Sequence, residues 1–310
     1  MRDDSLLPNR PILLATTGLS DCDAAVRAAA DLAEATRRPV QVVSVLEPPP
    51  IVGGEYGFVV PVEDVWVDRR NALLARIRRQ IKDALGRDPA WPIEIRSGDP
   101  ANTIAEVADQ MDAALIVMGL GEHHLLDRAL GTETALRTLR AARTPIFAVP
   151  QTYGSLPIRA VVGMDFGNSA VGAARSALGL LPSLTRMGLV HIAPRWDMQP
   201  SAYTQWREDY ETGVVPALEK VIKEIDAAPA VTITNVIREG KTTKELLKAA
   251  AEYAADMIIV GSRGLGFMDR MLVGSTASGI IRGAQIPVLA LPLAAIAAPT
   301  ESVELAGAST

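Results

Sequence analysis

Glycine and hydroxyl residues in the second half of the chain have the spacing of a phosphate-binding loop. Gly261 and Gly264 come directly after the apolar run 257–260, and nine residues later Gly274 and Ser275 follow. Glycines just past a buried strand let the backbone turn sharply and approach a ligand closely. A helix starting at Ser275 would offer free backbone N–H groups and a hydroxyl to an anion. The spacing predicts a phosphate cradle between a strand end and a helix start.

A carboxylate is predicted to face this cradle. Asp165 follows the aliphatic run 160–163, the first predicted strand of the same half. In an open parallel sheet, ligands bind at the carboxyl ends of the strands, where the strand order reverses. An adenine or ribose near Asp165, with phosphates near Gly274 and Ser275, would satisfy both groups. Two alternatives stay open: Asp165 as a helix N-cap, and the glycines as turn residues only.

The elements that must hold these residues occur twice. Segment 115–119 resembles 257–261, and 144–150 resembles 286–292, both at an offset of 142 residues. Short aliphatic strands alternate with Ala-rich helices near 23–36 and 169–181, which favours a doubly wound parallel sheet in each half. We expect an α/β protein with two tandem five-stranded, Rossmann-like domains. The other predicted strands are 12–15, 40–45 and 93–96 in the first half, and 160–163, 188–192 and 231–237 in the second.

The junction between the halves is predicted near residues 150–155. We assign residues 1–152 to the first domain, 153–295 to the second and 296–310 to a flexible tail. The Pro- and Gly-rich segment 48–62 is expected to be irregular.

Two helix starts are predicted from capping residues. Asp99 before Pro100 has the pattern of an N-cap followed by a proline at the first helical position. Thr242 and Glu245, after Gly240, have the spacing of a capping box.

Composition narrows the class of protein. Among 310 residues, 48% are hydrophobic and only 4% aromatic, which suits aliphatic strands buried on both faces. The net charge of −5 and the lack of a basic block argue against nucleic-acid binding. The single cysteine, Cys22, excludes an intramolecular disulfide and is expected to be a small buried residue. Without a long apolar run or a secretory-signal pattern, we expect a cytoplasmic protein with no membrane span.

The loop Gly-x-x-Gly, nine residues, Gly-Ser after the fourth strand, with an aspartate after the first, resembles the universal stress protein family. The resemblance covers both halves, so the chain resembles a tandem member with an adenine-nucleotide α-hydrolase-like fold. It implies a stress-response protein that binds ATP, alone or with Mg²⁺, in its second domain, the nucleotide acting as a regulatory ligand. The matching nucleotide-site residues are Gly163, Met164, Asp165, Ile192, Val260, Gly261, Arg263, Gly264, Gly274, Ser275 and Thr276.

The first half departs from this pattern. Thr17 stands where the aspartate is expected, and Gly119 and Gly121 are separated by one residue instead of two. At the offset of 142, Glu122 and Glu133 fall opposite Gly264 and Ser275, and an acid there repels phosphate. We therefore expect nucleotide binding in the second half only.

No catalytic constellation is recognised, so a binding protein is expected rather than an enzyme. His123 and His124 lack a third ligand at metal-site spacing, and His191, inside a predicted strand, is expected to be a hydrogen-bonded core residue. Two alternatives are a protein–protein interaction module that has lost nucleotide binding, and an enzyme of the adenine-nucleotide α-hydrolase group. The missing Ser-Gly-Gly pyrophosphatase loop argues against the enzyme.

The expected partners are an adenine nucleotide and an unidentified protein. The two halves are expected to pack as a pseudo-dimer through their fifth strands. A homodimer of the whole chain is compatible with the same pattern.

Overall fold

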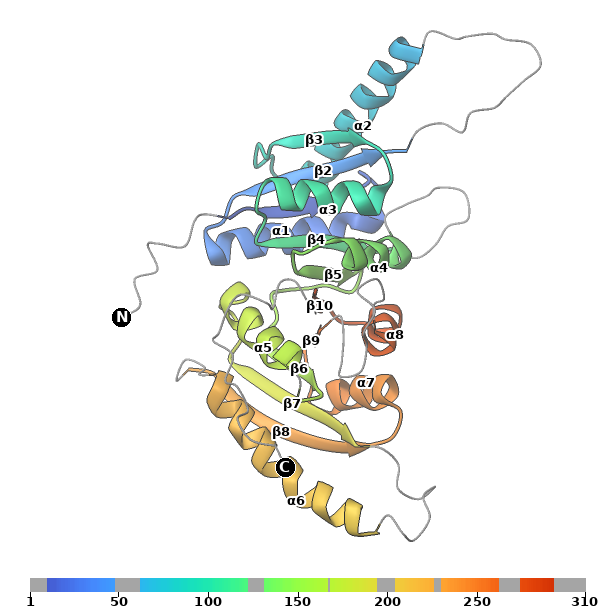
Figure 1. The fold of residues 1–310 in the computed structure, drawn as a ribbon. Coiled ribbons are helices and arrows are strands. Elements are labelled where there is room, and N and C mark those ends of the chain that lie inside the picture. Colours follow the sequence, from blue (N-terminus) through green and yellow to red (C-terminus); the bar gives the residue numbers. More distant parts are fainter. Residues whose placement is uncertain are drawn as a thin grey trace, which may run out of the picture.

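The computed structural model describes residues 10–47, 62–121, 131–166, 168–193, 204–225, 230–261 and 274–292. Its ten strands form one sheet in the order β3-β2-β1-β4-β5-β10-β9-β6-β7-β8 (Figure 1). The strands of the first half are β1 (Ile12–Ala15), β2 (Val40–Leu46), β3 (Ile93–Ser97), β4 (Leu115–Leu120) and β5 (Ile146–Pro150). Those of the second half are β6 (Arg159–Met164), β7 (Arg186–Ala193), β8 (Thr232–Glu239), β9 (Met257–Gly261) and β10 (Val288–Leu291).

Within each half the five strands are parallel and doubly wound, as the alternation of strands and helices predicts. The chain runs outward from β1 to β2 and β3, then returns to the other side of β1 for β4 and β5. The second half repeats this order from β6 to β10. The predicted fold class is confirmed.

The two halves meet through their fifth strands, as expected from the duplication. β5 and β10 pair antiparallel, with Phe147 opposite Leu289. All other strand pairs are parallel. The two five-stranded arrays are therefore continuous in one hydrogen-bonded sheet.

Helices cover both faces of this sheet (Figure 1). One apolar core lies between the sheet and α1 (Asp23–Thr36), α2 (Val62–Leu85), α5 (Asn168–Leu180) and α6 (Thr204–Ile225). The other lies between the sheet and α3 (Pro100–Gln110), α4 (Thr132–Ala141), α7 (Thr242–Glu252) and α8 (Ser275–Gly283). Strands buried on both faces require the continuous aliphatic runs seen in the sequence.

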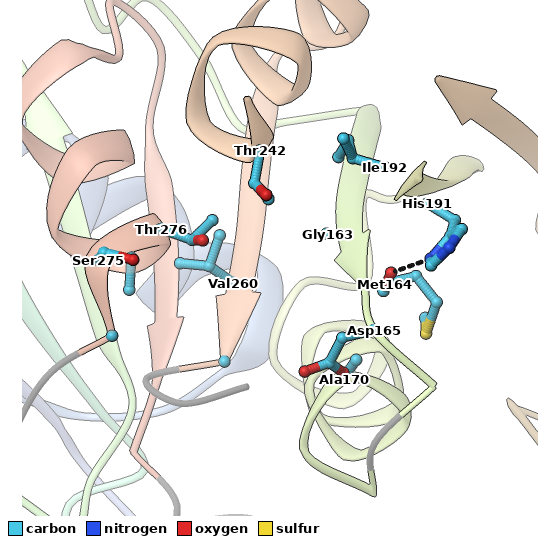
Figure 2. Close-up of a pocket in the computed structure, with 13 residues that line it drawn as sticks. Gly163, Met164, Asp165, Ala170, His191, Ile192, Thr242, Val260, Ser275 and Thr276 are labelled. Atoms are coloured by element: carbon cyan, nitrogen blue, oxygen red, sulfur yellow. Dashed lines mark hydrogen bonds between the residues drawn. The ribbon is translucent and has the colours of Figure 1, made fainter. Parts of the chain in front are cut away.

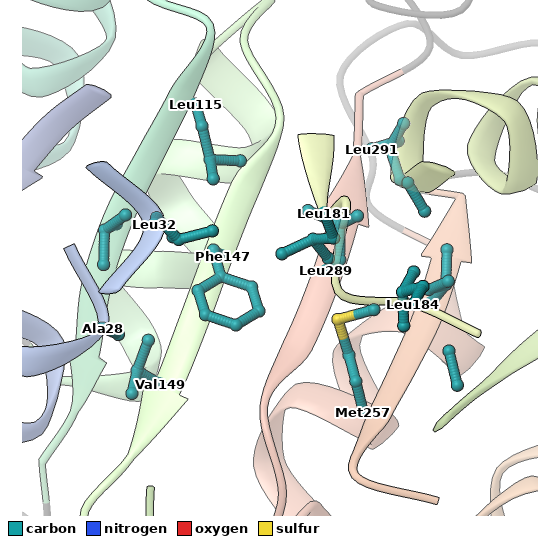
Figure 3. Close-up of a cluster of buried hydrophobic side chains, with 14 of the residues drawn as sticks. Ala28, Leu32, Leu115, Phe147, Val149, Leu181, Leu184, Met257, Leu289 and Leu291 are labelled. Carbon is teal, nitrogen blue, oxygen red and sulfur yellow. The ribbon is translucent and has the colours of Figure 1, made fainter. Parts of the chain in front are cut away.

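The first core continues across the seam between the halves. Figure 3 shows Phe147 of β5 beside Leu289 of β10, with Leu32 of α1 on one side and Leu181 on the other. Phe147 is fully buried. Burial of these side chains makes the seam part of the protein core.

The link between the halves is attached to both of them. Thr152 Oγ1 donates to the carbonyl oxygen of Gln285 at 2.5 Å, in the second half. The Tyr153 hydroxyl donates to Asp31 Oδ2 at 2.7 Å, on α1 of the first half. These bonds fall where the junction is predicted, although the assigned boundary between residues 152 and 153 stays a prediction.

The two predicted helix starts have different outcomes. Asp99 caps α3 as predicted, because its Oδ1 accepts from the backbone N–H of Asn102 at 3.1 Å and Pro100 is the first helical residue. The predicted capping box at Thr242 is wrong. Lys241 has the extended backbone of a cap, and its carbonyl accepts the helical bond from Glu245 N at 3.0 Å. Thr242 is already the first residue of α7.

A 3₁₀ turn, η2 (Ser20–Cys22), precedes α1. No helix within the described residues is both long and apolar enough to cross a membrane. Residues 48–61 of the predicted irregular segment 48–62 and the tail 296–310 lie outside the described residues, whereas Val62 begins α2.

Candidate functional site

β6 and β9 pair at their starts and part at their carboxyl ends. Their register runs from Ala160 opposite Met257 to Val162 opposite Ile259. Beyond that pair, Gly163 and Val260 line opposite sides of a cavity of about 310 Å³. Because β6 leads to β7 on one side and β9 leads to β10 on the other, this is the point where strand order reverses, and it is the usual ligand position in such folds.

Residues of β6, α5, β7, α7, β9 and α8, with their flanking loops, line the cavity (Figure 2). Figure 2 shows the end of β6 on one side and β9 with the start of α8 on the other, with His191 and Ile192 of the neighbouring strand β7 beside β6. The lining residues are Gly163, Met164, Asp165, Ala170, His191, Ile192, Thr242, Val260, Gly261, Gly274, Ser275, Thr276 and Ala277.

The start of α8 offers backbone donors to this cavity. Gly274 is the N-cap residue and has no side chain with which to cap the helix. The first bond of the helix runs from Ser278 N to the Gly274 carbonyl, so the N–H groups of Ser275, Thr276 and Ala277 precede the helical ladder. With the Ser275 and Thr276 hydroxyls, these donors suit an anion, and the helix dipole favours one there.

Asp165 stands on the opposite side of the cavity. Its carboxylate oxygens point toward the side formed by β9 and α8 (Figure 2). α5 begins at Asn168, so Asp165 does not occupy the N-cap position that was an open alternative. A carboxylate facing the anion site cannot bind phosphate itself, but it can accept hydrogen bonds from hydroxyl groups of the same ligand.

His191 is a buried, hydrogen-bonded strand residue, as predicted, and it also lines the cavity. Its Nδ1 lies 2.8 Å from the Met164 carbonyl oxygen, and its Nε2 contacts the Tyr210 hydroxyl of α6. The sequence did not predict that His191 lines the cavity, because a histidine inside an apolar strand looks like any other core residue. Its position at the cavity depends on where the neighbouring strand β6 ends.

Thr242 is the other polar lining residue that the sequence interpretation missed. It is the first residue of α7, and its hydroxyl faces the cavity in Figure 2. The sequence signal was present but was assigned to capping, since a threonine at a helix start fits either role.

The predicted site residues come together. Gly163, Met164, Asp165, Ile192, Val260, Gly261, Gly274, Ser275 and Thr276 all line the cavity. Arg263 and Gly264, like His123 and His124, lie outside the described residues. Within the described residues, no group of three or more His, Cys, Asp or Glu side chains could hold a metal ion.

Comparison with known proteins places this geometry in a family. The model of the universal stress protein family matches the chain twice, over residues 8–150 and 159–292. The chain belongs to the universal stress protein family. It is a tandem member, because each match covers one of the two five-stranded halves.

Several relatives match this chain along most of its length and of their own. A universal stress protein of Mycolicibacterium smegmatis is 25% identical over 288 residues, which cover 90% of this chain and 95% of the relative. A crystal structure of a universal stress protein from Archaeoglobus fulgidus aligns with a TM-score of 0.58 at 19% identity, covering 92% and 96% of the two chains. A putative universal stress protein from Pseudomonas aeruginosa aligns with a TM-score of 0.59 at 15% identity, covering 93% and 94%. The structural similarities show the fold.

In the first universal stress protein domain, described protein groups pack around the corresponding strand ends. β1 and β4 stay paired one step further, through Ala15 opposite Met118, which correspond to Gly163 and Val260. The turn η2 lies against the end of β4. A Cβ atom on Gly119 would lie 3.3 Å from Cys22 Cα, and one on Gly121 would lie 2.8 Å from Asp21 Oδ2.

Two side chains of α2 form hydrogen bonds with the segment 16–19, which follows β1. Gln80 Oε1 accepts from the buried Thr16 hydroxyl at 2.8 Å, and its Nε2 contacts the Leu19 carbonyl. Arg76 Nη2 donates to the Thr17 carbonyl at 2.9 Å. Among the described residues, η2 and two side chains of α2 therefore pack around the ends of β1 and β4 in the first domain.

Cys22 belongs to η2 and is fully buried, as predicted. Burial and the neighbouring Asp21 carboxylate raise the pKa of its thiol to about 11. The thiol stays protonated at neutral pH, which makes it a packing residue and not a nucleophile.

Proposed function

We propose that the second domain binds ATP in the cavity between β6 and β9, and that the first domain does not bind it. The observation that carries this proposal is the position of Asp165 and the start of α8 on opposite sides of one cavity. A nucleotide has hydroxyl donors at the ribose and anionic acceptors at the phosphates, so it matches both sides. The volume of about 310 Å³ is within the range of small-molecule pockets, roughly 300–1,000 Å³.

The apolar part of the cavity suits a purine base. Ile192 and Val260 contribute aliphatic surface beside the two polar sides. The Met164 side chain is buried in the core that includes α5 and α6. Ile192 is half-buried and packs into the core under α7, which leaves its backbone groups at the cavity edge. Backbone donors and acceptors at that place can pair with the edge of the base.

Nucleotide in this site is proposed to act as a regulatory ligand. Among the lining residues that the structure describes, Asp165 and His191 are the titratable ones, and both His191 nitrogens are engaged by protein groups. That arrangement offers no base positioned to activate water at the phosphates. Mg²⁺, when present, would be carried chiefly by the phosphates and water. A stress-related role, a cytoplasmic location and homodimer formation are part of this proposal on the ground of family membership.

Calorimetric titration of the full-length protein with ATP and Mg²⁺ tests the proposal. We expect one ATP bound per chain. Asp165→Asn removes the charge while keeping the shape, and should weaken ATP binding about 10- to 100-fold, since hydrogen bonds to a charged group contribute about 1.5–3 kcal/mol.

The first domain provides the matched controls. Thr17→Asn at the position corresponding to Asp165 should leave ATP affinity unchanged. An absence of binding at millimolar ATP would overturn the proposal and favour the interaction-module alternative. A stoichiometry of two would overturn the assignment to the second domain alone.

A further inference from the structure

His191 contacts the chain on both sides of Asp165. Its Nδ1 lies 2.8 Å from the carbonyl oxygen of Met164, the residue before Asp165. Its ring centroid lies 4.5 Å from that of Phe166, the residue after, with the planes tilted by 43°. His191 itself is only 8% exposed, within β7. The imidazole therefore touches both neighbours of the carboxylate that faces the ligand.

The partners of His191 define which nitrogen carries the proton. A carbonyl oxygen can only accept, so Nδ1–H donates to Met164. In the neutral ring Nε2 then accepts from the Tyr210 hydroxyl, which fixes the ring against α6. The Tyr210 hydroxyl therefore fixes the imidazole through Nε2, and the imidazole fixes the end of β6 through its Nδ1 bond to Met164.

The turn that contains Asp165 needs such support. Phe166 has φ of 61°, in the left-handed region that is uncommon for a bulky residue. A conformation of this kind persists when surrounding contacts hold it in place. The His191 ring packed on Phe166 is such a contact, and it fixes the direction in which the Asp165 carboxylate points.

The first domain supplies an internal comparison. By strand register, Thr16, Thr17 and Gly18 correspond to Met164, Asp165 and Phe166, and Ser44 corresponds to His191. Gly18 takes the same left-handed conformation, φ 79°, as a residue suited to it. The domain that lacks the carboxylate thus also lacks the imidazole and the aromatic ring.

We propose that His191 is a positioning residue of the nucleotide site, which orients Asp165 toward the ribose hydroxyls by holding Met164 and Phe166. This inference rests on the proposed ATP binding. It predicts that removing the imidazole weakens ATP affinity in the same way as removing the Asp165 charge, although the imidazole does not itself bind the ribose hydroxyls.

The test compares ATP with 2′,3′-dideoxy-ATP, which lacks the ribose hydroxyls, by calorimetric titration of the full chain. His191→Leu should weaken the affinity for ATP about tenfold or more, and should change the affinity for dideoxy-ATP by no more than about threefold. Asp165→Asn should have the same two effects. The double variant should be no weaker than Asp165→Asn alone. His191→Asn, whose amide N–H can still donate to Met164, should retain ATP binding within a few-fold.

The outcomes separate this inference from the proposed function. Two results would overturn the positioning role and leave ATP binding in place. In the first, Asp165→Asn weakens the affinity for ATP more than that for dideoxy-ATP, while His191→Leu binds both nucleotides like the wild type. In the second, His191→Leu weakens the affinities for both nucleotides equally. Losses that multiply in the double variant would also overturn it. No ATP binding by the wild type overturns both.

A measurement without ligand keeps the proposal falsifiable if His191→Leu does not fold. The ¹⁵N spectrum of the full chain, which has three histidines, should show His191 in the Nδ1–H tautomer. Tyr210→Phe should change the Nε2 shift of that residue. An Nε2–H tautomer would overturn the proposal.

Discussion

Asp256 and the cavity lie at opposite ends of the same strand pair. Asp256, just before β9, accepts from the backbone N–H of Arg159 at 3.0 Å and pairs with its guanidinium at 2.9 Å, at the start of β6. The Asp256 N–H in turn donates to the Arg159 carbonyl at 2.8 Å. A single carboxylate thus joins β6 and β9 where they are paired, and their carboxyl ends part around the cavity.

The stability contributed by Asp256 should depend on pH. Partial burial alone would raise the pKa of its carboxyl, but hydrogen bonds from Arg159 and from two backbone N–H groups lower it. A lowered folded pKa means that stabilisation is present above the ordinary value of 3.8 and is lost as the pH falls through the folded value. Asp256→Asn should therefore lower the urea midpoint at about pH 7 and have little effect near pH 2.

A matched control for Asp256→Asn is Glu133→Gln. Glu133 pairs with Arg282 across the two halves, but both side chains are about half exposed, so little stability should be lost at either pH. An equal loss for Asp256→Asn at both pH values would contradict the linkage.

At the element scale, the helices differ in how the backbone N–H groups of their first turns are satisfied. Asp99 closes the start of α3 with a side-chain acceptor. α7 and α8 instead begin with Lys241 and Gly274 at the cap, and both starts meet the cavity between β6 and β9 through Thr242 and Ser275. A ligand can satisfy the first-turn N–H groups in place of a cap.

The α3 cap leads to a prediction about that element. Asp99→Ala should lower the free energy of unfolding by about 1 kcal/mol, whereas Asp99→Asn should cost much less, because asparagine keeps the acceptor. Urea denaturation measures both. Equal losses would show that the pair between Asp99 and Arg137, and not the cap, holds this helix start.

At the scale of the whole molecule, the antiparallel β5–β10 seam joins two domains into one sheet. Phe147 lies at the centre of that seam and is fully buried. Leu289 of the other half is its register partner. Because the apolar core runs through the seam, the two domains are expected to unfold together.

Phe147→Ala should therefore destabilise both domains. Loss of a buried aromatic ring costs about 3–5 kcal/mol, and calorimetry should show one transition moved to lower temperature. Phe147→Leu, which leaves a smaller cavity, should give a smaller shift. Two transitions, of which only one moves, would contradict a shared core.

Much of the fold and of the site could be predicted from residues close together in the chain. The aliphatic runs, the repeat at an offset of 142 and the N-cap at Asp99 each depend on neighbours a few positions away or on direct comparison of the halves. The proximity of Asp165 to Gly274 and Ser275 could also be predicted, because the carboxyl ends of parallel strands lie at one edge of the sheet. Contacts between the fifth strands were expected from the duplication.

Tertiary structure decided the features that depend on distant partners. The pairing of β6 with β9 ends at Val162 and Ile259, whereas β1 and β4 stay paired through Ala15 and Met118. Neighbours in the sequence do not determine where such pairing ends. The turn at Asp21 and the α2 side chains that pack around the strand ends of the first domain come from separate segments. His191 likewise acquires its role from Met164 and Phe166. The sequence by itself determined the elements and the residue types at the candidate site. Only packing between remote segments determined where the paired strands part and which side chains surround their ends, because these contacts join residues far apart in the chain.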